Sequence, residues 1–334
     1  MYLKSNHFFF YKVVMKKIAF IFPGQGSQMV GMGLELYKNH MKAREVFDAV
    51  DESLNQKLSK TIFNGDEEQL KLTSNAQPAL MVMSIALVRV LENELGKKLT
   101  DFTEIVLGHS LGEYTSLCSI DSIDISSAAK LLRIRGNSMQ NSVNNIETRM
   151  VAVIGLKLEI IEELLNKFST EKDFLCEVAN DNCPGQVILS GLKRSVDKFS
   201  EVLTSSGARS IIDLQVSAPF HCSLMKPAAE VMSKALEDVN IKKPTIKFIN
   251  NVSAEFIDEP YEIKKKLIEQ VYNRVRWRES IIKVSKSKID EIIEIGSGKV
   301  LTGLNRRMNI KQNFSNITTF NDIENFIKSH GENL

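Results

Sequence analysis

A five-residue turn between an apolar run and a helix constrains this chain more than any other feature. The run 104–107 (EIVL) is short and apolar, and the sequence GHSLG (108–112) follows it directly. The G-x-S-x-G pattern is typical of a sharp strand-to-helix turn, because side chains at the glycine positions would collide. Such a turn holds the Ser110 hydroxyl at the carboxyl end of a sheet, beside helix N-terminal amides. We therefore expect an acyl-transfer site, although the pattern by itself also recurs by chance.

The rest of the chain alternates apolar runs with amphipathic segments, which predicts an α/β fold with a mostly parallel sheet covered by helices. The core is expected to be hydrolase-like, to begin at Met15, and to end in a polar, peripheral tail after Met308. The expected elements before the middle of the chain are a strand at 16–22, helices at 42–55 and 75–95, a strand at 104–109 and a helix at 124–142. Those after residue 217 are a helix at 224–238, a strand at 245–249, a helix at 261–272, a strand at 290–295 and a helix from about 299.

The middle of the chain has a different order of expected strands and helices. Strands are expected at 150–154, 174–179, 186–190 and 210–214, with helices at 158–168 and 195–206. The order β-α-β-β-α-β is that of a ferredoxin-like unit. We expect residues 145–216 to form this small subdomain, inserted between residues 15–144 and 217–334 of the core. Residues 1–14 are expected to be a disordered extension or the product of a misplaced start codon.

Composition narrows the classes of function. The 334 residues carry a formal net charge of +2, and no basic stripe with interleaved aromatic residues suggests nucleic-acid binding. The four cysteines form no C-x-x-C pair, so neither a zinc site nor a disulfide framework is expected, and a reducing cytoplasm fits best. No apolar run approaches the ~20 residues of a membrane helix, so we expect no membrane association.

A serine nucleophile needs a base, and the chain has only five histidines. His7 and His330 lie in the expected tails, His40 lies in a polar connection, and the turn points His109 away from the hydroxyl. His221, where the inserted unit returns to the core, is therefore the expected base, although a structural role at such a junction is the alternative. No Asp or Glu is identified by motif as its orienting partner, and a backbone carbonyl could do the same.

Arg135 lies in the middle of an apolar helix face. That face is formed by Ala128, Leu131, Leu132 and Met139. No carboxylate lies three or four residues away, and an unpaired buried guanidinium is costly, so this arginine needs an anion from elsewhere. Either it pairs with a distant structural acid, or it binds a substrate carboxylate, for which a guanidinium is well shaped. Arg133, on the polar face, is expected to be solvated.

A glycine-rich loop, PGQGSQ (23–28), follows the first strand. Its amides could supply half of an oxyanion hole, with the amide of Leu111 as the other half. It is not a dinucleotide-binding loop, because Met29 occupies a required glycine position. GSGK (296–299) is likewise not a P-loop, because Ile293 and Val300 stand where glycine and Ser/Thr are needed. Both segments are expected to be tight strand-to-helix turns.

From Met15 onward the chain resembles the bacterial malonyl-CoA:acyl-carrier-protein transacylases, which are related to the acyltransferase domains of polyketide and fatty-acid synthases. The order and spacing of seven motifs make the resemblance specific. These are FPGQGSQ (22–28), GHSLGE (108–113), RIRG (133–136), NDNCPGQ (180–186), APFH (218–221), QVYN (270–273) and GSGKVL (296–301).

The resemblance implies a ping-pong reaction in which malonyl passes from coenzyme A to a serine and then to the phosphopantetheine thiol of an acyl carrier protein. No metal or cofactor is implied, since the CoA thioester is a substrate, and we expect a cytoplasmic monomer. The resemblance implies that Ser110 is the nucleophile, that His221 is the base, and that the backbone carbonyl of Gln270 orients His221. It implies that the amides of Gln25 and Leu111 form the oxyanion hole and that Arg135 holds the malonyl carboxylate. Asn180 and Asn182 would line the site on the side of the small subdomain.

The chain departs from the family pattern at two positions. The family usually has proline where Arg274 stands and serine where Cys183 stands. The first departure could alter the loop that presents the Gln270 carbonyl, but neither touches a reacting group. Phe220, directly before His221, is expected to narrow the acyl pocket and to favour malonyl over branched methylmalonyl.

Other functions remain possible from the sequence. A polyketide acyltransferase acting in trans would use the same residues with another carrier, and a hydrolase would result if water reached the acyl-serine. An inactive scaffold that binds a carrier protein is disfavoured by the intact Ser110, His221 and Arg135. The resemblance also implies a strongly acidic carrier, which could meet basic residues that are otherwise ordinary surface charges: Lys264, Lys265, Arg276, Lys299 and Arg306.

Overall fold

The computed structural model describes residues 16–143, 146–168 and 172–331, and its larger sheet has five strands that all run parallel. The strands in spatial order are β7 (Lys247–Ile249), β2 (Ile105–Gly108), β1 (Ile18–Phe22), β8 (Glu291–Ile295) and β9 (Asn313–Ile317). Because they are parallel, all five carboxyl ends lie at one edge of the sheet. The expectation for residues 1–14, and His7 with it, lies outside the described residues.

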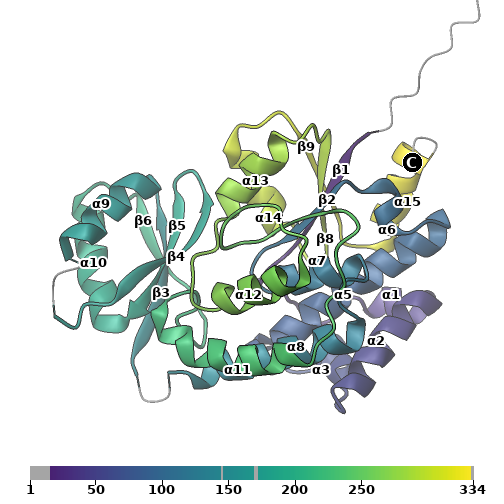
Figure 1. Ribbon diagram of the computed structural model, residues 1–334, viewed down its shortest axis with the longest axis horizontal. Coiled ribbons are helices and arrows are strands. Elements are labelled where there is room, and N and C mark those ends of the chain that lie inside the picture. Colours follow the sequence, from purple (N-terminus) through teal and green to yellow (C-terminus); the bar gives the residue numbers. More distant parts are fainter. Residues whose placement is uncertain (1–15, 144–145, 169–171, 332–334) are drawn as a thin grey trace, which may run out of the picture.

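Helices cover both faces of this sheet (Figure 1). Side chains alternate along β1, so that Phe20 packs into the larger cluster with the long helices, whereas Ala19 and Ile21 pack against α13 and α14. The expected mostly parallel α/β architecture is therefore confirmed. The helices are α1 (Leu34–Asn39), α2 (Met41–Ser53), α3 (Leu58–Asn64), α4 (Glu67–Lys71), α5 (Thr73–Leu95), α6 (Leu99–Phe102), α7 (Gly112–Ser119), α8 (Ile125–Asn141), α9 (Leu158–Phe168), α10 (Lys193–Ser205), α11 (Lys226–Glu237), α12 (Pro260–Gln270), α13 (Trp277–Ser285), α14 (Val300–Asn305) and α15 (Phe320–His330).

The longest helix, α5, corrects one expectation from the sequence. Its 23 residues are long and apolar enough to cross a membrane by length and composition, so the statement that no such run exists was wrong. However, 89% of its apolar window is buried inside the protein, where it packs against α2, α7 and α8. The apolar surface of α5 is thus covered by protein, as in a core helix.

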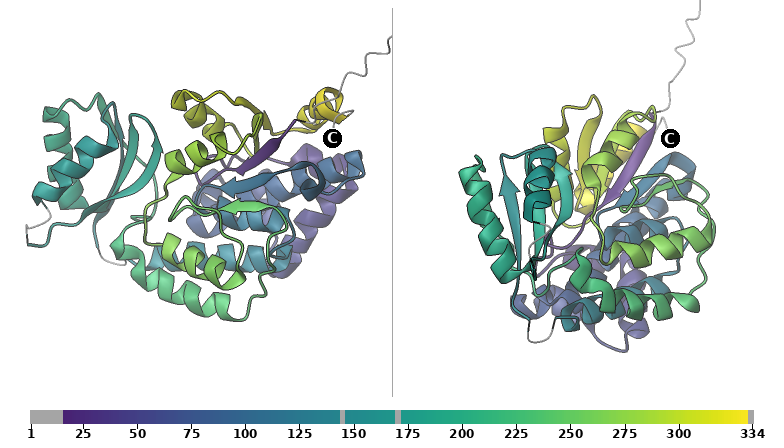
Figure 2. Two further views of the ribbon diagram at one scale, coloured as in Figure 1. Left: turned by 45° about the horizontal axis from the view of Figure 1, so that its top comes forward. Right: turned by 60° about the vertical axis from the view of Figure 1, so that its left-hand side comes forward.

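The second sheet is antiparallel and stands to one side of the larger body (Figure 2). Its spatial order is β4 (Cys176–Cys183), β5 (Gln186–Leu192), β3 (Thr148–Ile154) and β6 (Ser210–Asp213), which is the ferredoxin-like arrangement. Val151 and Val153 pack beneath α9 and α10, whereas the alternate residues Met150 and Ala152 join the main core cluster. Because side chains alternate along β3, the two faces of this strand pack into two different hydrophobic cores.

The edge strand β4 is tied to the loop after α12. Val275 bonds through its amide to the carbonyl of Ala179 (2.8 Å), and its carbonyl accepts from the amide of Asp181 (2.9 Å). Arg278 adds an ion pair to the Asp181 carboxylate (2.8 Å). This junction places β4 next to the carboxyl edge of the large sheet.

The segment after Met308 was expected to be a peripheral tail, and this was wrong. Its residues form β9 at the edge of the large sheet and α15, whose Phe326 ring lies 6.2 Å from that of Phe20. His330 is buried, and its Nε2 lies 2.9 Å from the Glu291 carboxylate. The polar residues of the segment form the outer faces of an amphipathic strand and helix, which explains the wrong expectation.

We expect Phe326→Ala to lower the free energy of unfolding by about 3–5 kcal/mol, because it leaves a cavity against Phe20 and Phe102. Urea unfolding followed by circular dichroism measures this. Glu324→Ala, an exposed residue of the same helix, is the matched control and should change stability by less than about 0.5 kcal/mol. Equal effects of the two substitutions would mean that α15 is only loosely attached.

Candidate active site

Steric constraint alone explains the glycines around Ser110. A Cβ at Gly108 would lie 1.9 Å from the backbone of Gly112, and a Cβ at Gly112 would lie 2.4 Å from the carbonyl oxygen of Phe22. Ser110 itself has φ 54°, a left-handed conformation that is uncommon for a residue with a side chain. The elbow expected from the sequence is therefore present, between the end of β2 and the start of α7.

His221 lies against Ser110 with defined proton positions. Its Nε2 is 2.8 Å from Ser110 Oγ, and its Nδ1 is 2.8 Å from the backbone carbonyl oxygen of Gln270. A carbonyl can only accept, so the hydrogen is on Nδ1 and Nε2 is left to accept the Ser110 proton. The carbonyl implied for this place by the resemblance thus lies within hydrogen-bond distance.

Burial keeps His221 uncharged. Its desolvation, together with the positive charge of Arg135, lowers the pKa of His221 from 6.5 to about 3. Neutral imidazole is the form that can accept a proton, so the side chain is ready to act as a base at neutral pH.

Arg135 projects from α8 into the same place and is 1% exposed. Its Nη2 donates to Ser110 Oγ (3.1 Å) and to Gln270 Oε1 (2.8 Å), and its Nη1 donates to Gln77 Oε1 (2.9 Å). Within the described ranges no carboxylate lies within ion-pair distance of the guanidinium, and its Nε has no partner. The structure therefore gives this cation neutral neighbours and leaves donors for an anion beside Ser110.

Arg133 was expected to be solvated, and this was wrong. Its Nη1 donates to Asn75 Oδ1 (2.5 Å), and burial lowers its pKa. Asn75 belongs to the first turns of α5, so Arg133 is half-buried against that helix rather than solvated.

The backbone near Ser110 leaves particular amides available. The amide of Ser110 donates to Asn251 Oδ1 (2.7 Å), and the amide of Gly26 donates to Gln28 Oε1 (2.8 Å). Two other amides are candidates for an oxyanion hole. They belong to Leu111, the N-cap residue of α7, and to Gln25 in the loop after β1. Since β1 and β2 are adjacent, both belong to the same sheet edge.

The small sheet also reaches the elbow. His109 Nε2 lies 2.9 Å from Asn182 Oδ1, so His109 points away from the Ser110 hydroxyl as expected. Asn180 and Asn182 are both buried on β4, and Asn180 forms the bridge to Val275. Phe220, before His221, lies in the main core cluster, and its amide approaches the sulfur of Met150.

The two departures from the family pattern leave the elbow intact. Arg274 forms an ion pair with Glu162 on α9 (2.7 Å), and the contact of His221 with the Gln270 carbonyl remains at 2.8 Å. Cys183 is buried at the end of β4. Arg274 thus gives the junction between the two sheets an additional ion pair.

Three residues that sequence analysis did not select complete the site: Gln77, Glu113 and Asn251. Each is a polar residue that is almost fully buried. Gln77 lies in the apolar helix α5, and Glu113 and Asn251 follow strands β2 and β7 at the carboxyl edge. A polar residue within an apolar segment was the available signal.

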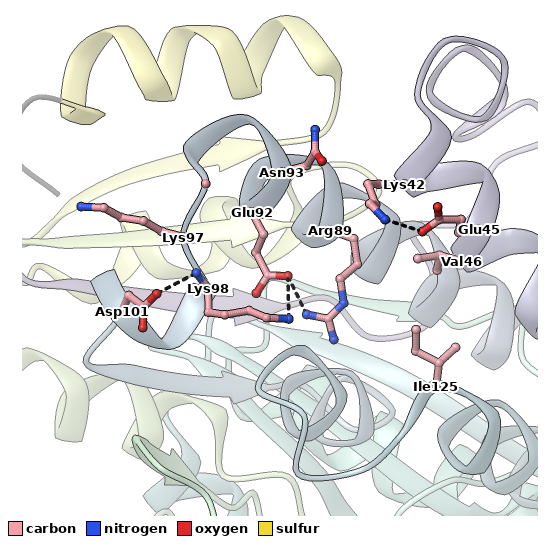
Figure 3. A pocket seen from close by; sticks show the side chains of 11 residues that line it. Lys42, Glu45, Val46, Arg89, Glu92, Asn93, Lys97, Lys98, Asp101 and Ile125 are labelled. Atoms are coloured by element: carbon pink, nitrogen blue, oxygen red, sulfur yellow. Dashed lines mark hydrogen bonds and ion pairs between the residues drawn. The ribbon is translucent and has the colours of Figure 1, made fainter.

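A separate pocket of about 500 Å³ lies near the other end of α5 (Figure 3). Arg89, which lines it, is twelve residues from Gln77, or ~18 Å along the helix. Arg89 and Lys98 both reach the carboxylate of Glu92, and Lys42 pairs with Glu45, so these three cations are neutralised by the carboxylates of the pocket. Among the described residues no group of three His, Cys, Asp or Glu side chains could hold a metal ion.

The chain is similar to known acyltransferases over most of its length. The model of the acyl transferase domain family matches residues 19–321. The malonyl CoA-acyl carrier protein transacylase of Bacillus subtilis is 46% identical over 296 residues, covering 88% of this chain and 91% of the relative. That of Haemophilus influenzae is 36% identical, covering 94% and 100%.

Solved structures agree with the sequence relatives. An acyl-carrier-protein S-malonyltransferase from Bartonella henselae superposes with a TM-score of 0.90 at 45% identity, covering 94% of this chain and 99% of that one. A malonyl-transacylase described in complex with a type II polyketide acyl-carrier protein superposes with a TM-score of 0.88 at 32% identity, covering 94% and 99%.

The geometry of His221 predicts how Ser110 reactivity depends on pH. Because the pKa of His221 is lowered to about 3, the imidazole stays neutral as pH falls from 8 to 5. The rate at which a serine-directed phosphonate labels Ser110 should therefore stay constant over this range. Ser110→Ala should abolish labelling, and His221→Ala should slow it by about 10²–10⁴-fold. Loss of half the wild-type rate near pH 6.5 would contradict the buried, neutral base.

Proposed function

The chain belongs to the acyl transferase family, and from this premise we propose that it transfers malonyl from malonyl-CoA to the phosphopantetheine thiol of holo acyl carrier protein, supplying extender units for fatty-acid synthesis. One observation carries the proposal beyond the family. The buried Arg135 guanidinium lies 3.1 Å from Ser110 Oγ and has no carboxylate in contact among the described residues. An acyl group on Ser110 that ends in a carboxylate satisfies this cation.

In the first half-reaction Ser110 Oγ attacks the thioester carbonyl, and His221 Nε2 takes its proton. The negative charge on the carbonyl oxygen is stabilised by the amides of Gln25 and Leu111. The C–S bond then breaks, and the coenzyme A thiolate receives the proton from His221. The product is a malonyl-serine ester with neutral histidine.

The second half-reaction reverses the roles. The carrier's thiol gives its proton to His221, and the sulfur attacks the ester carbonyl of malonyl-Ser110. The C–O bond breaks and Ser110 Oγ recovers the proton. Since both halves use the same residues, one site serves two thiols in turn, which is a ping-pong mechanism. Arg135 holds the malonyl carboxylate throughout, and Asn180 and Asn182 contact the substrate from the side of β4.

A polyketide carrier is the second candidate partner. The structural neighbour bound to a type II polyketide carrier protein supports it, since that neighbour shares the fold over 94% of this chain. The chemistry at Ser110 is the same for both carriers. Transfer rates to purified fatty-acid and polyketide carriers, compared side by side, distinguish them.

The basic residues proposed for carrier docking differ in their surroundings. Lys265 and Arg276 are paired with Glu269 and Glu279, and Lys264 donates to a backbone carbonyl. Lys299 and Arg306 are exposed, and neither has an ion pair within the described part of the chain. Both flank α14, which follows the carboxyl end of β8. We therefore propose Lys299 and Arg306 as the contacts for an acidic carrier.

We propose further that the protein works as a cytoplasmic monomer without a metal or bound cofactor. The four cysteines are free and buried, which suits a reducing compartment. The coenzyme A thioester is a substrate that enters and leaves.

Radiolabelled malonyl-CoA tests the proposed reaction. Wild type should acquire one label, which Ser110→Ala should not, because the ester forms on Ser110 Oγ. Addition of holo carrier protein should move the label to the carrier, and apo carrier, lacking the thiol, is the matched control. Label that passes only to water would establish a hydrolase instead.

Phe220 gives a prediction about acyl selectivity. Phe220 is buried and directly precedes His221 in the chain, so we propose that Phe220→Ser opens space near the acyl chain. The ratio of kcat/KM for malonyl-CoA over methylmalonyl-CoA should fall by about tenfold, the effect of one methyl group in a tight pocket. Parallel assays with the two thioesters measure it, and an unchanged ratio would show that the ring does not limit the acyl group.

A further inference from the structure

A buried carboxylate next to the elbow has no role in the reaction steps. Glu113 lies in the first turn of α7, three residues after Ser110, and is fully buried. Its Oε1 accepts from the amide of Asn251 (2.5 Å), and its Oε2 accepts from Gln270 Nε2. Both contacts point into the protein, beneath the elbow. A charged group in such a place is costly unless it is paired and hydrogen-bonded.

The side chain of Gln270 links Glu113 to Arg135. Its Nε2 donates to Glu113 and to the backbone carbonyl of Ser110 (2.9 Å), and its Oε1 accepts from Arg135 Nη2 (2.8 Å). A guanidinium only donates, whereas a carboxylate and a carbonyl only accept. These neighbours therefore permit only one of the two orientations of the Gln270 amide.

In its ionised form, Glu113 is also the anion that balances Arg135 at a distance. Burial raises the pKa of Glu113 to about 8, while the two N–H donors and the charge of Arg135 act in the opposite direction. Burial likewise lowers the pKa of Arg135. The amide between them has its oxygen toward the cation and its nitrogen toward the anion, so its dipole favours both charges.

Loss of the charge on Glu113 would disturb this chain of contacts. A protonated carboxyl presents a donor where Gln270 Nε2 now donates. The inverted amide would relieve that conflict, but it would turn N–H groups toward the Arg135 guanidinium, where two donors face each other. The state of Glu113 is thereby transmitted, through the Gln270 amide, to the Arg135 guanidinium.

We propose that Glu113 is a positioning residue for substrate selection: acting through the Gln270 amide, its carboxylate holds the Arg135 guanidinium in place to bind the carboxylate of the acyl group. This inference rests on the proposed function. Gln270 then has two duties, since its backbone carbonyl orients His221 and its side chain orients Arg135. Glu113 supports the second of these, the orientation of Arg135.

Glu113→Gln tests the proposal with little change in shape. The new amide offers one oxygen to two donors, the Asn251 amide and Gln270 Nε2, so one of them loses its acceptor. In single-turnover loading of Ser110, the apparent KM for malonyl-CoA should rise by about 10- to 100-fold, which corresponds to one hydrogen bond to a charged group. The rate of labelling by the uncharged phosphonate should change by less than about threefold, because this reagent has no carboxylate for Arg135 to bind.

Two further variants calibrate the effect. Glu92→Gln alters another buried glutamate that accepts a backbone amide, that of Leu99, in the distant pocket. It should leave the KM for malonyl-CoA unchanged. Glu113→Asp keeps the charge with a shorter side chain and should restore part of the lost affinity.

The wild-type protein provides a test that needs no variant. Glu113, with its raised pKa, is ionised above about pH 8 and protonated below it. The apparent KM of the loading step should therefore be lowest above pH 8 and should rise as pH falls toward 6. Two other titratable groups around it, His221 and Tyr114, do not titrate in this range, because the pKa of His221 is about 3 and the pKa of Tyr114 is raised above its usual value. Arg135 also faces Glu113, and burial lowers its pKa. The profile should be flat in Glu113→Gln.

Equal losses in malonyl loading and phosphonate labelling would overturn the proposal and assign Glu113 a purely structural role. An unchanged KM in a folded Glu113→Gln protein, or a flat wild-type KM profile, would also overturn it. These results differ from failure of the proposed function, in which wild-type Ser110 would not accept malonyl at all.

Discussion

The burial of one guanidinium organises this protein. Arg135 is 1% exposed, and removing such a charge from water is costly unless neighbouring groups stabilise it. Gln77 on α5, Gln270 on α12 and Ser110 at the elbow each accept a hydrogen bond from it. Three segments that are far apart in sequence therefore meet at a single side chain. The contacts of the guanidinium link α5, α8 and α12 to Ser110.

The parallel sheet makes this convergence possible. Because β1, β2 and β7 run in the same direction and are adjacent, the segments that follow them emerge at one edge. Gln25, Ser110 and Asn251 come from these three segments. The helices then add Arg135 and Gln270 from one face, and β4 adds Asn182 from the second sheet. The site thus lies where two sheets and one helical layer meet, although each contributes only a few atoms.

The sequence predicted those features that depend on local chemistry. The elbow at Ser110 follows from steric constraint within five residues, and the position of Arg135 on an apolar face follows from helical periodicity. The Gln270 carbonyl came only from the resemblance, because a backbone group leaves no mark in residue type. Glu113 and Asn251 were missed because they are hydrogen-bonded to each other across 138 residues of sequence. The segment after Met308 was misjudged because β9 and α15 are amphipathic elements whose apolar sides become visible only once packed.

In the proposed reaction, the cation that would bind the acyl carboxylate also affects the strength of the base. The charge of Arg135 is one cause of the lowered pKa of His221, second only to burial. A carboxylate held against Arg135 offsets that charge, so it raises the pKa of His221 and makes the imidazole a better proton acceptor. An acyl group without a carboxylate leaves the base weak. In the proposed reaction, selection of the acyl group and activation of Ser110 would thereby be coupled through one electrostatic interaction, which binding affinity by itself would not provide.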